Sequence, residues 1–194
     1  MKTLTLTQQD IRRLLAAIRP GAPFAGRDHN MLTLVLHTGL RVGELSGLEV
    51  QDVAWQDQPR HTLSLRAEIA KGSKARVIPL NQTARAALFG LLKFNQSRGF
   101  SVAPDAPLLQ NRFHRRLSVR DIQRLVQSLR QVAGLDTDSP TPHTLRHVFA
   151  TSCLQKGAKL PALQRILGHS RLTSSQVYLH PSADDLAEAV QLLD

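Results

Sequence analysis

Apolar residues recur with a helical period over most of the chain. The first such stretch carries Ile11, Leu14, Leu15 and Ile18 on one face. Thr7 and Asp10 are spaced to cap its start, and Pro20 with Gly21 stops it. Comparable patterns predict further helices near residues 27–37, 42–48, 84–94 and 118–132, two more that end at Gly157 and Gly168, and a last one over 182–193.

The pattern changes between about residues 50 and 80. Residues 52–55, 61–66 and 75–80 alternate between apolar and polar positions with period two, which is typical of strands. We interpret them as one small antiparallel sheet, with Lys71 to Lys74 as the turn of its last hairpin. The sequence therefore predicts a mainly α protein with a small antiparallel β-sheet, an α+β fold.

Length and charge narrow the class of protein. At 194 residues the chain is most simply one domain. Its formal net charge of +10 indicates a polyanionic partner. Nucleic acid is the favoured partner, and a membrane surface is the alternative. There is neither an apolar run of about 20 residues nor a secretion signal, so we expect a cytoplasmic protein. A single cysteine, Cys153, excludes an internal disulfide and a cysteine pair for a metal.

A single tyrosine marks the candidate chemistry. Tyr178 lies nine residues after His169 and thirty-two after Arg146. A phenolic hydroxyl is a poor nucleophile at neutral pH, so a site that uses one must supply a proton acceptor and cations around the phosphorus under attack. Arg146 is framed by His143 and His147 at the start of a predicted helix, so the three side chains fall on adjoining faces.

Two parts of the chain carry a family resemblance. The segments 143–147 (His-Thr-Leu-Arg-His), 167–169 (Leu-Gly-His) and 177–180 (Val-Tyr-Leu-His) together resemble the carboxy-terminal box of the tyrosine recombinase (phage integrase) family. Upstream, residues 37–45 (His-Thr-Gly-Leu-Arg-Val-Gly-Glu-Leu) resemble that family's first box. The resemblance implies a single catalytic domain over residues 1–194, without the separate amino-terminal core-binding domain that is usual in the family.

The resemblance also implies a catalytic set, namely Arg41, Lys71, His143, Arg146, His169 and Tyr178. In this set Tyr178 is the nucleophile. Arg41 and Arg146 bind the phosphate, for which a guanidinium fork is better suited than an ammonium group. By the same resemblance, His143 acts as base or phosphate contact, and His169 donates a hydrogen bond to a phosphate oxygen. Lys71 protonates the departing 5′ oxygen.

Supporting residues and simpler alternatives accompany this set. Glu44, one turn after Arg41, would orient Arg41. His147 would support the helix that carries Arg146. Alternatively, Arg41 is an ordinary solvated arginine, Glu44 a surface charge and Lys71 a turn lysine. Lys74 lies in the same turn and is the other candidate for the acid.

Metal chemistry fits the sequence less well. His143 and His147 have the spacing of a helical zinc pair, but Thr144 stands where a zinc protease needs a glutamate. A two-metal nuclease needs clustered carboxylates, whereas the acidic residues here are scattered. A metal-free mechanism therefore fits better, and the resemblance implies that no other cofactor is needed.

A basic run follows residue 111. The residues expected to contact DNA are Arg112, Arg115, Arg116, Arg120 and Arg124, together with Lys74. Arg116, Arg120 and Arg124 have the spacing of one helical face, which would suit contacts to the DNA backbone. A solvated charged face is the alternative.

The resemblance implies a site-specific DNA recombinase or integrase that works through a 3′-phosphotyrosyl link. Its partners would be double-stranded DNA and further copies of itself, as a dimer on one site and a tetramer on paired sites. The last helix, too short to be stable alone, is expected to dock on a neighbouring protomer, or else on its own domain. The alternative functions are a type IB topoisomerase, a catalytically idle DNA-binding accessory protein and, least of all, another basic structural protein.

Overall fold

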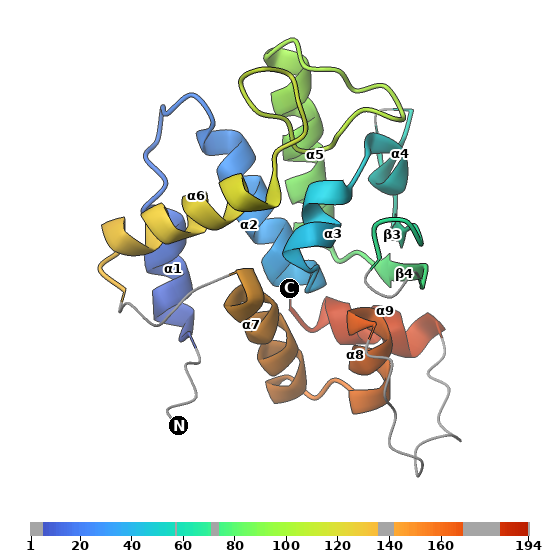
Figure 1. Cartoon of the computed structure of the whole chain (residues 1–194). Helices are drawn as coiled ribbons and strands as arrows, with labels where there is room; N and C mark the ends of the chain where they lie inside the picture. The colour runs from blue at the N-terminus through green and yellow to red at the C-terminus, as the bar shows by residue number, and fades with distance from the viewer. Residues whose placement is uncertain (1–5, 57, 71–73, 136–141, 169–182, 194) are drawn as a thin grey trace.

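The computed structural model describes residues 6–56, 58–70, 74–135, 142–168 and 183–193. The elements in chain order are α1 (Gln8–Ala16), α2 (Ala25–Thr38), α3 (Val42–Gly47), α4 (Val50–Val53), β1 (Ala54–Trp55), β2 (Gln58–Pro59), β3 (Thr62–Leu65), β4 (Arg76–Pro79), α5 (Gln82–Ser97), α6 (Val119–Val132), α7 (Pro142–Gln155), α8 (Leu160–Leu167) and α9 (Ala183–Gln191). Helices dominate, with the short strands at one side (Figure 1). The predicted mainly α fold with a little antiparallel sheet is confirmed.

Local capping signals set several helix ends. Thr7 and Asp10 form a capping box at the start of α1, and the Ser118 side chain accepts the Asp121 amide at the start of α6. Gly39 and Gly168 end α2 and α8 in the left-handed conformation, with φ of 63° and 65°. These ends follow the sequence prediction because capping depends on neighbouring residues alone.

The strands form two small sheets rather than the single sheet expected. β3 pairs antiparallel with β4, with Leu65 opposite Arg76, and β1 pairs with β2 in a separate hairpin. The predicted strand over residues 52–55 is wrong in its first half, because those residues end α4. A capping box, in which Asp52 accepts the Glu49 amide at 2.9 Å, starts this helical turn. The predicted turn at Lys71 lies outside the described residues.

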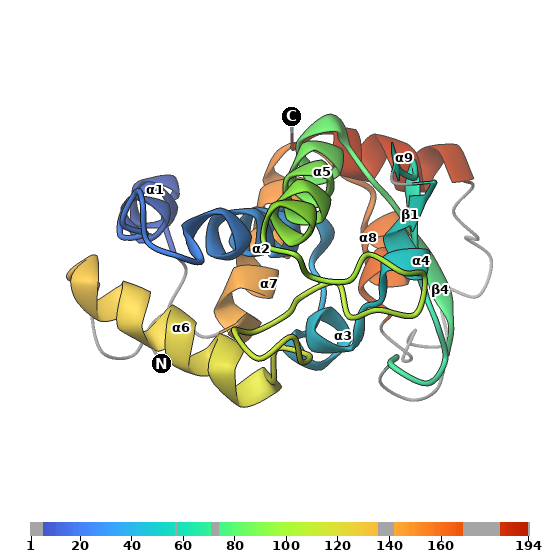
Figure 2. The ribbon, with the colours of Figure 1, turned by 90° about the horizontal axis from the view of Figure 1, so that it is seen from above.

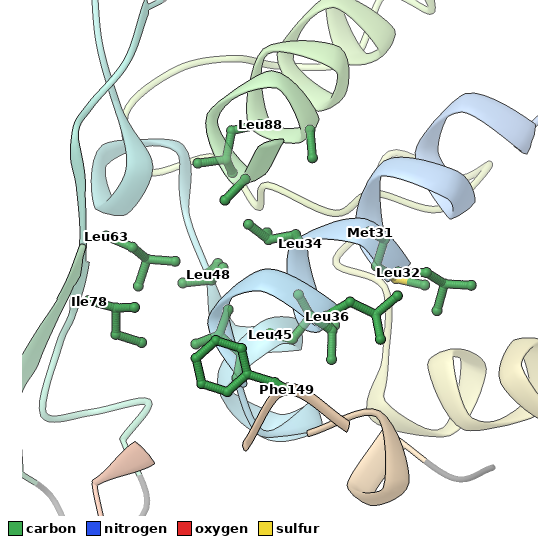
Figure 3. Close-up of a cluster of buried hydrophobic side chains, with 14 of the residues drawn as sticks. Met31, Leu32, Leu34, Leu36, Leu45, Leu48, Leu63, Ile78, Leu88 and Phe149 are labelled. Carbon is green, nitrogen blue, oxygen red and sulfur yellow. The ribbon is translucent and has the colours of Figure 1, made fainter. Parts of the chain in front are cut away.

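The core surrounds α2, which packs against α5 on one side and α7 on the other (Figure 2). Met31 and Leu34 of α2 are fully buried. Figure 3 shows Phe149 of α7 beside Leu45 of α3, with Ile78 reaching in from the strands. Phe149 also lies against Gly39, so the turn between α2 and α3 packs on α7.

The last helix, α9, packs on its own chain. It lies against α8 and β4 (Figures 1 and 2), with Leu186, Ala189 and Val190 buried. The Asn81 side chain donates a hydrogen bond of 3.2 Å to the Val190 carbonyl oxygen. Within the single chain, α8 and β4 thus offer the apolar surface that this stripe needs, which is the alternative of docking on its own domain. Docking on a neighbouring protomer stays a prediction.

No helix within the described ranges is long and apolar enough to span a bilayer.

Candidate active site

A glycine turn between α2 and α3 positions Arg41. Gly39 has φ of 63°, and a Cβ atom there would lie 2.5 Å from Cδ1 of Phe149 and 2.9 Å from Cδ2 of Leu167. Only glycine fits this conformation and this close packing without strain. The chain then enters α3 with Arg41 as its N-cap residue, and the Arg41 amide donates to the Glu44 carboxylate at 2.9 Å.

Glu44 is a buried anion that holds two arginines. It is 1% exposed. Arg41 Nη1 donates to its Oε1 at 2.9 Å, and Arg76 spans both oxygens at 2.9 and 2.8 Å. Burial raises the pKa of Glu44, but the hydrogen bonds from Arg76 and Arg41 outweigh it and bring the pKa below its ordinary value. Glu44 is therefore ionised at neutral pH and fixes the direction of Arg41, the contact expected from the sequence.

Arg146 joins two distant segments. From the first turns of α7 it donates 2.6 Å hydrogen bonds to the carbonyl oxygens of Gly39 and Leu167. Burial first, and then repulsion from Arg41 and Arg76, lower the pKa of Arg146 to about 10. It still carries its charge at neutral pH. A fixed cation whose charge is disfavoured by burial and by neighbouring cations is suited to bind an anion.

The carboxyl end of α8 gathers three arginines. Its Ile166 carbonyl oxygen accepts from Arg76 Nε at 2.7 Å. The Leu167 oxygen accepts from Arg146, and the Gly168 oxygen accepts from Arg41 Nη2 at 3.4 Å. A helix carboxyl end bears partial negative charge, which offsets the repulsion among the cations. With one carboxylate among three guanidinium groups, the cluster keeps a net positive charge.

The remaining predicted catalytic residues fall into two groups. His143 is exposed on α7, one turn before Arg146, and so lies beside it on the helix surface. Lys71, His169 and Tyr178 lie outside the described residues. His169 directly follows Gly168 in the chain, where the arginines gather.

The two residues assigned supporting roles differ in their surroundings. Glu44 is buried among cations, whereas His147 is exposed on α7. Within the described ranges, no group of three or more His, Cys, Asp or Glu is placed to hold a metal ion.

Arg76 is the member of the cluster that the sequence reasoning missed. It shares one face of β4 with Ile78, which is fully buried. An arginine on the inward face of a strand needs a buried acceptor. That inward, period-two position is the signal that could have found it.

The predicted helical face shared by Arg116, Arg120 and Arg124 is wrong. Arg116 precedes α6 and does not share a helical face with Arg120 and Arg124. Its guanidinium donates to the Ser46 and Leu48 carbonyl oxygens at 2.8 and 3.1 Å and pairs with Glu49 at 3.2 Å. Arg116 therefore fastens the loop before α6 to α3. The helical spacing with Arg120 did not predict this, because the acceptors of Arg116 are distant in the sequence.

The other basic residues are on the surface. Arg112, Arg115, Arg120, Arg124 and Lys74 are all exposed. Arg120 and Arg124 lie on α6, whose first turns lie beside α3 (Figures 1 and 2). Arg112 stacks over the exposed Phe113 ring at 4.6 Å. These positions suit contacts with a polyanion.

Comparison with known proteins decides the family. Residues 5–184 match the model of the phage integrase family. The chain belongs to the phage integrase family. Its similar relatives include the tyrosine recombinase XerD of Xanthomonas campestris, 37% identical over 183 residues that cover 89% of this chain and 54% of the relative. Tyrosine recombinase XerC of Thermodesulfovibrio yellowstonii is 33% identical over 187 residues, which cover 94% of this chain and 60% of the relative.

Solved structures of recombinases have the same fold. XerA recombinase superposes with a TM-score of 0.70 at 29% identity, over 95% of this chain and 63% of that one. XerH recombinase, in a post-cleavage complex with its palindromic difH substrate, gives 0.69 at 25% identity, over 97% of this chain and 53% of that one. The chain thus spans little more than half the length of the proteins that it matches.

Proposed function

We propose that this chain is the catalytic domain of a site-specific DNA recombinase that cuts and rejoins strands through a 3′-phosphotyrosyl intermediate. The observation that carries the proposal is the cluster of Arg41, Arg146 and Glu44 at the end of α8, directly before His169. Relatives named tyrosine recombinases, and the structure of XerH recombinase in a post-cleavage complex with its substrate, support it.

The arginines supply the electrostatic part of the mechanism. Phosphodiester cleavage passes through a pentavalent phosphorus that carries extra negative charge on its nonbridging oxygens. Arg41 and Arg146, held in place by Glu44 and by backbone carbonyls, stabilise this state more than the substrate because they do not reorganise as the charge develops. His169 would add a hydrogen bond to one of these oxygens.

Proton transfer completes the step. The Tyr178 oxygen bonds to phosphorus and the bond from phosphorus to the 5′ oxygen breaks. The phenolic proton passes to a base, for which His143 is the candidate, and the departing oxygen takes a proton from Lys71. The phosphotyrosyl link keeps the bond energy, so a 5′ hydroxyl of a new partner can attack it and reseal the strand without ATP. Charge neutralisation by guanidinium groups makes a metal unnecessary for this route.

The substrate and assembly follow from the same chemistry. Double-stranded DNA is the partner, held through its backbone by Arg112, Arg115, Arg120, Arg124 and Lys74, while Arg116 stays in its internal contacts. Exchange between two sites requires several protomers, as a dimer on one site and a tetramer on paired sites. Acting on chromosomal or mobile DNA implies a cytoplasmic location.

Covalent trapping tests the proposal. The chain is incubated with nicked duplexes of randomised sequence, in which cleavage beside the nick releases a short strand and traps the adduct. We expect adducts that persist in EDTA and share a sequence motif. Adducts without a motif, with relaxation of supercoiled plasmid by the monomer, would indicate a topoisomerase. Binding without any adduct would indicate an accessory protein.

A further inference from the structure

We propose that Arg76 is a positioning residue for the cleavage step, which fastens the Glu44–Arg41 pair to the end of α8. This inference rests on the proposed function. Arg76 binds both oxygens of the Glu44 carboxylate and also the carbonyl oxygen of Ile166 in α8. Through Glu44 it acts on Arg41, which binds the phosphate in the proposed function, rather than on the phosphate itself.

The geometry of Arg76 is that of a clamp. Its side chain is 10% exposed. Nη1 and Nη2 bind the two Glu44 oxygens at 2.9 and 2.8 Å, and Nε binds the Ile166 oxygen at 2.7 Å. The guanidinium also lies against Gly168, where a Cβ atom would be 3.1 Å from Nη1. All three guanidinium nitrogens of Arg76 therefore donate to groups of the chain itself.

The clamp fixes Arg41 indirectly. Glu44 Oε1 accepts from both Arg41 Nη1 and Arg76 Nη1 at 2.9 Å. A carboxylate bound through both oxygens by Arg76 cannot rotate, so its second contact fixes the direction of Arg41. Without Arg76, Glu44 would be held only from its own helix by Arg41.

The clamp also lies close in the chain to two predicted catalytic residues, Lys71 and His169. Gly168 directly precedes His169, and Arg76 follows Lys71 by five residues at the start of β4. Anchoring β4 to α8 therefore fixes Arg76 relative to Gly168, the described residues from which the chain continues toward Lys71 and His169. A misplacement of about 1 Å in such an arrangement can cost about a hundredfold in rate.

Lysine cannot replace this arginine. Its ammonium is a single point of donation on a flexible stem, so it cannot hold a carboxylate through both oxygens and a helix carbonyl together. Arg76→Lys keeps the charge and removes the geometry, which separates positioning from electrostatics. Arg76→Gln removes both.

Arg27 offers a matched control. Its side chain is 9% exposed, and it binds the Asp28 carboxylate at 2.8 and 2.7 Å and the Gln110 carbonyl oxygen at 2.9 Å. It therefore makes the same kinds of contact at a similar burial, at the start of α2 and away from the arginine cluster. Arg27→Gln should lower the melting temperature about as much as Arg76→Gln.

The test compares these variants on a nicked substrate recovered from the trapping experiment. Single-turnover cleavage is measured at saturating DNA, well below every melting point, with DNA affinity measured separately. We expect Arg76→Gln and Arg76→Lys each to cleave about tenfold or more slowly while DNA affinity changes by less than about threefold. Arg27→Gln should cleave within about twofold of the unmodified chain.

Coupling to Glu44 provides a second readout, which also serves if Arg76→Gln does not fold. Because Arg76 and Glu44 act through one contact, Glu44→Gln combined with Arg76→Lys should be no slower than the slower single variant. Additive losses, a normal rate in Arg76→Lys, or an equal loss in Arg27→Gln would overturn the role of Arg76. Absence of any adduct from the unmodified chain would instead overturn the proposed function, and this inference with it.

Discussion

The guanidinium of Arg146 lies 2.6 Å from the carbonyl oxygen of Gly39, 107 residues earlier in the chain. This bond ties α7 to the turn that leads into Arg41. The turn can approach so closely because Gly39 has no side chain. Its conformation and its contacts with Phe149 and Leu167 are thus part of how the two arginines come together.

Gly39→Ala should therefore be costly. The left-handed conformation penalises alanine by about 1 kcal/mol, and the new Cβ would overlap Phe149 and Leu167, which adds about 1–3 kcal/mol of overpacking. Gly99→Ala is the control, because Gly99 has φ of 69° with nothing within 4 Å of a Cβ atom. Denaturant unfolding should show a markedly larger loss for Gly39→Ala, and equal losses would show that packing at this turn is unimportant.

Glu44 should make stability depend on pH. Because its pKa is lowered from the ordinary value of 4.5 in the folded protein, its stabilising effect is fully present above pH 4.5 and is lost as the pH falls through the folded pKa. At pH 7, Glu44→Gln should lose about 3 kcal/mol, since it leaves Arg41 and Arg76 without their anion.

Melting curves between pH 7 and pH 3.5 provide the measurement. The gap between the unmodified chain and Glu44→Gln should be constant at neutral pH and narrow in the acid range. A gap that is the same throughout would mean that the carboxylate charge contributes nothing to the site.

The carboxy-terminal helix should stabilise the isolated chain. Val190 of α9 is fully buried against its own domain, whereas the next residue, Gln191, is exposed. Val190→Asp should lower the melting temperature by more than about 5 °C, whereas Gln191→Asp should change it little. If Val190→Asp melts normally but fails to assemble on paired DNA sites, the helix docks on a neighbouring protomer after all.

Lys71 and Lys74 can be separated chemically. A substrate whose 5′ leaving oxygen is replaced by sulfur departs without protonation, so it should restore cleavage by Lys71→Ala. It should not restore cleavage by Arg146→Ala, whose defect is in charge stabilisation. Gel-based cleavage rates for both substrates provide the comparison, and rescue of Lys74→Ala instead would assign the acid to Lys74.

Features encoded by near neighbours could be predicted from the sequence. The capping box of Thr7, the cap at Ser118 and the left-handed glycines at 39 and 168 all depend on contacts within one turn. The two family boxes gave the pair Arg41 and Arg146, which the structure brings to the same end of α8.

Features that depend on contacts between residues far apart in the sequence could not be predicted in this way. Arg76 binds Glu44, which lies 32 residues earlier in the chain, and Arg116 binds the Ser46 carbonyl oxygen, 70 residues earlier. Neither separation leaves a periodic signal, because the acceptor is fixed only after the chain folds. The alternation at residues 52–55 misled for a different reason: a local capping box at Glu49, whose Asp52 also pairs with Arg66, favours a helical turn there.

The covalent link to Tyr178 is the central claim and can be measured directly. After reaction with the nicked substrate, the trapped complex is digested and the peptide that carries nucleotide is identified by mass spectrometry. The account predicts a phosphodiester on Tyr178, and a Tyr178→Phe chain that binds the same DNA but forms no adduct. Nucleotide attached to another residue, or an adduct that persists in Tyr178→Phe, would contradict it.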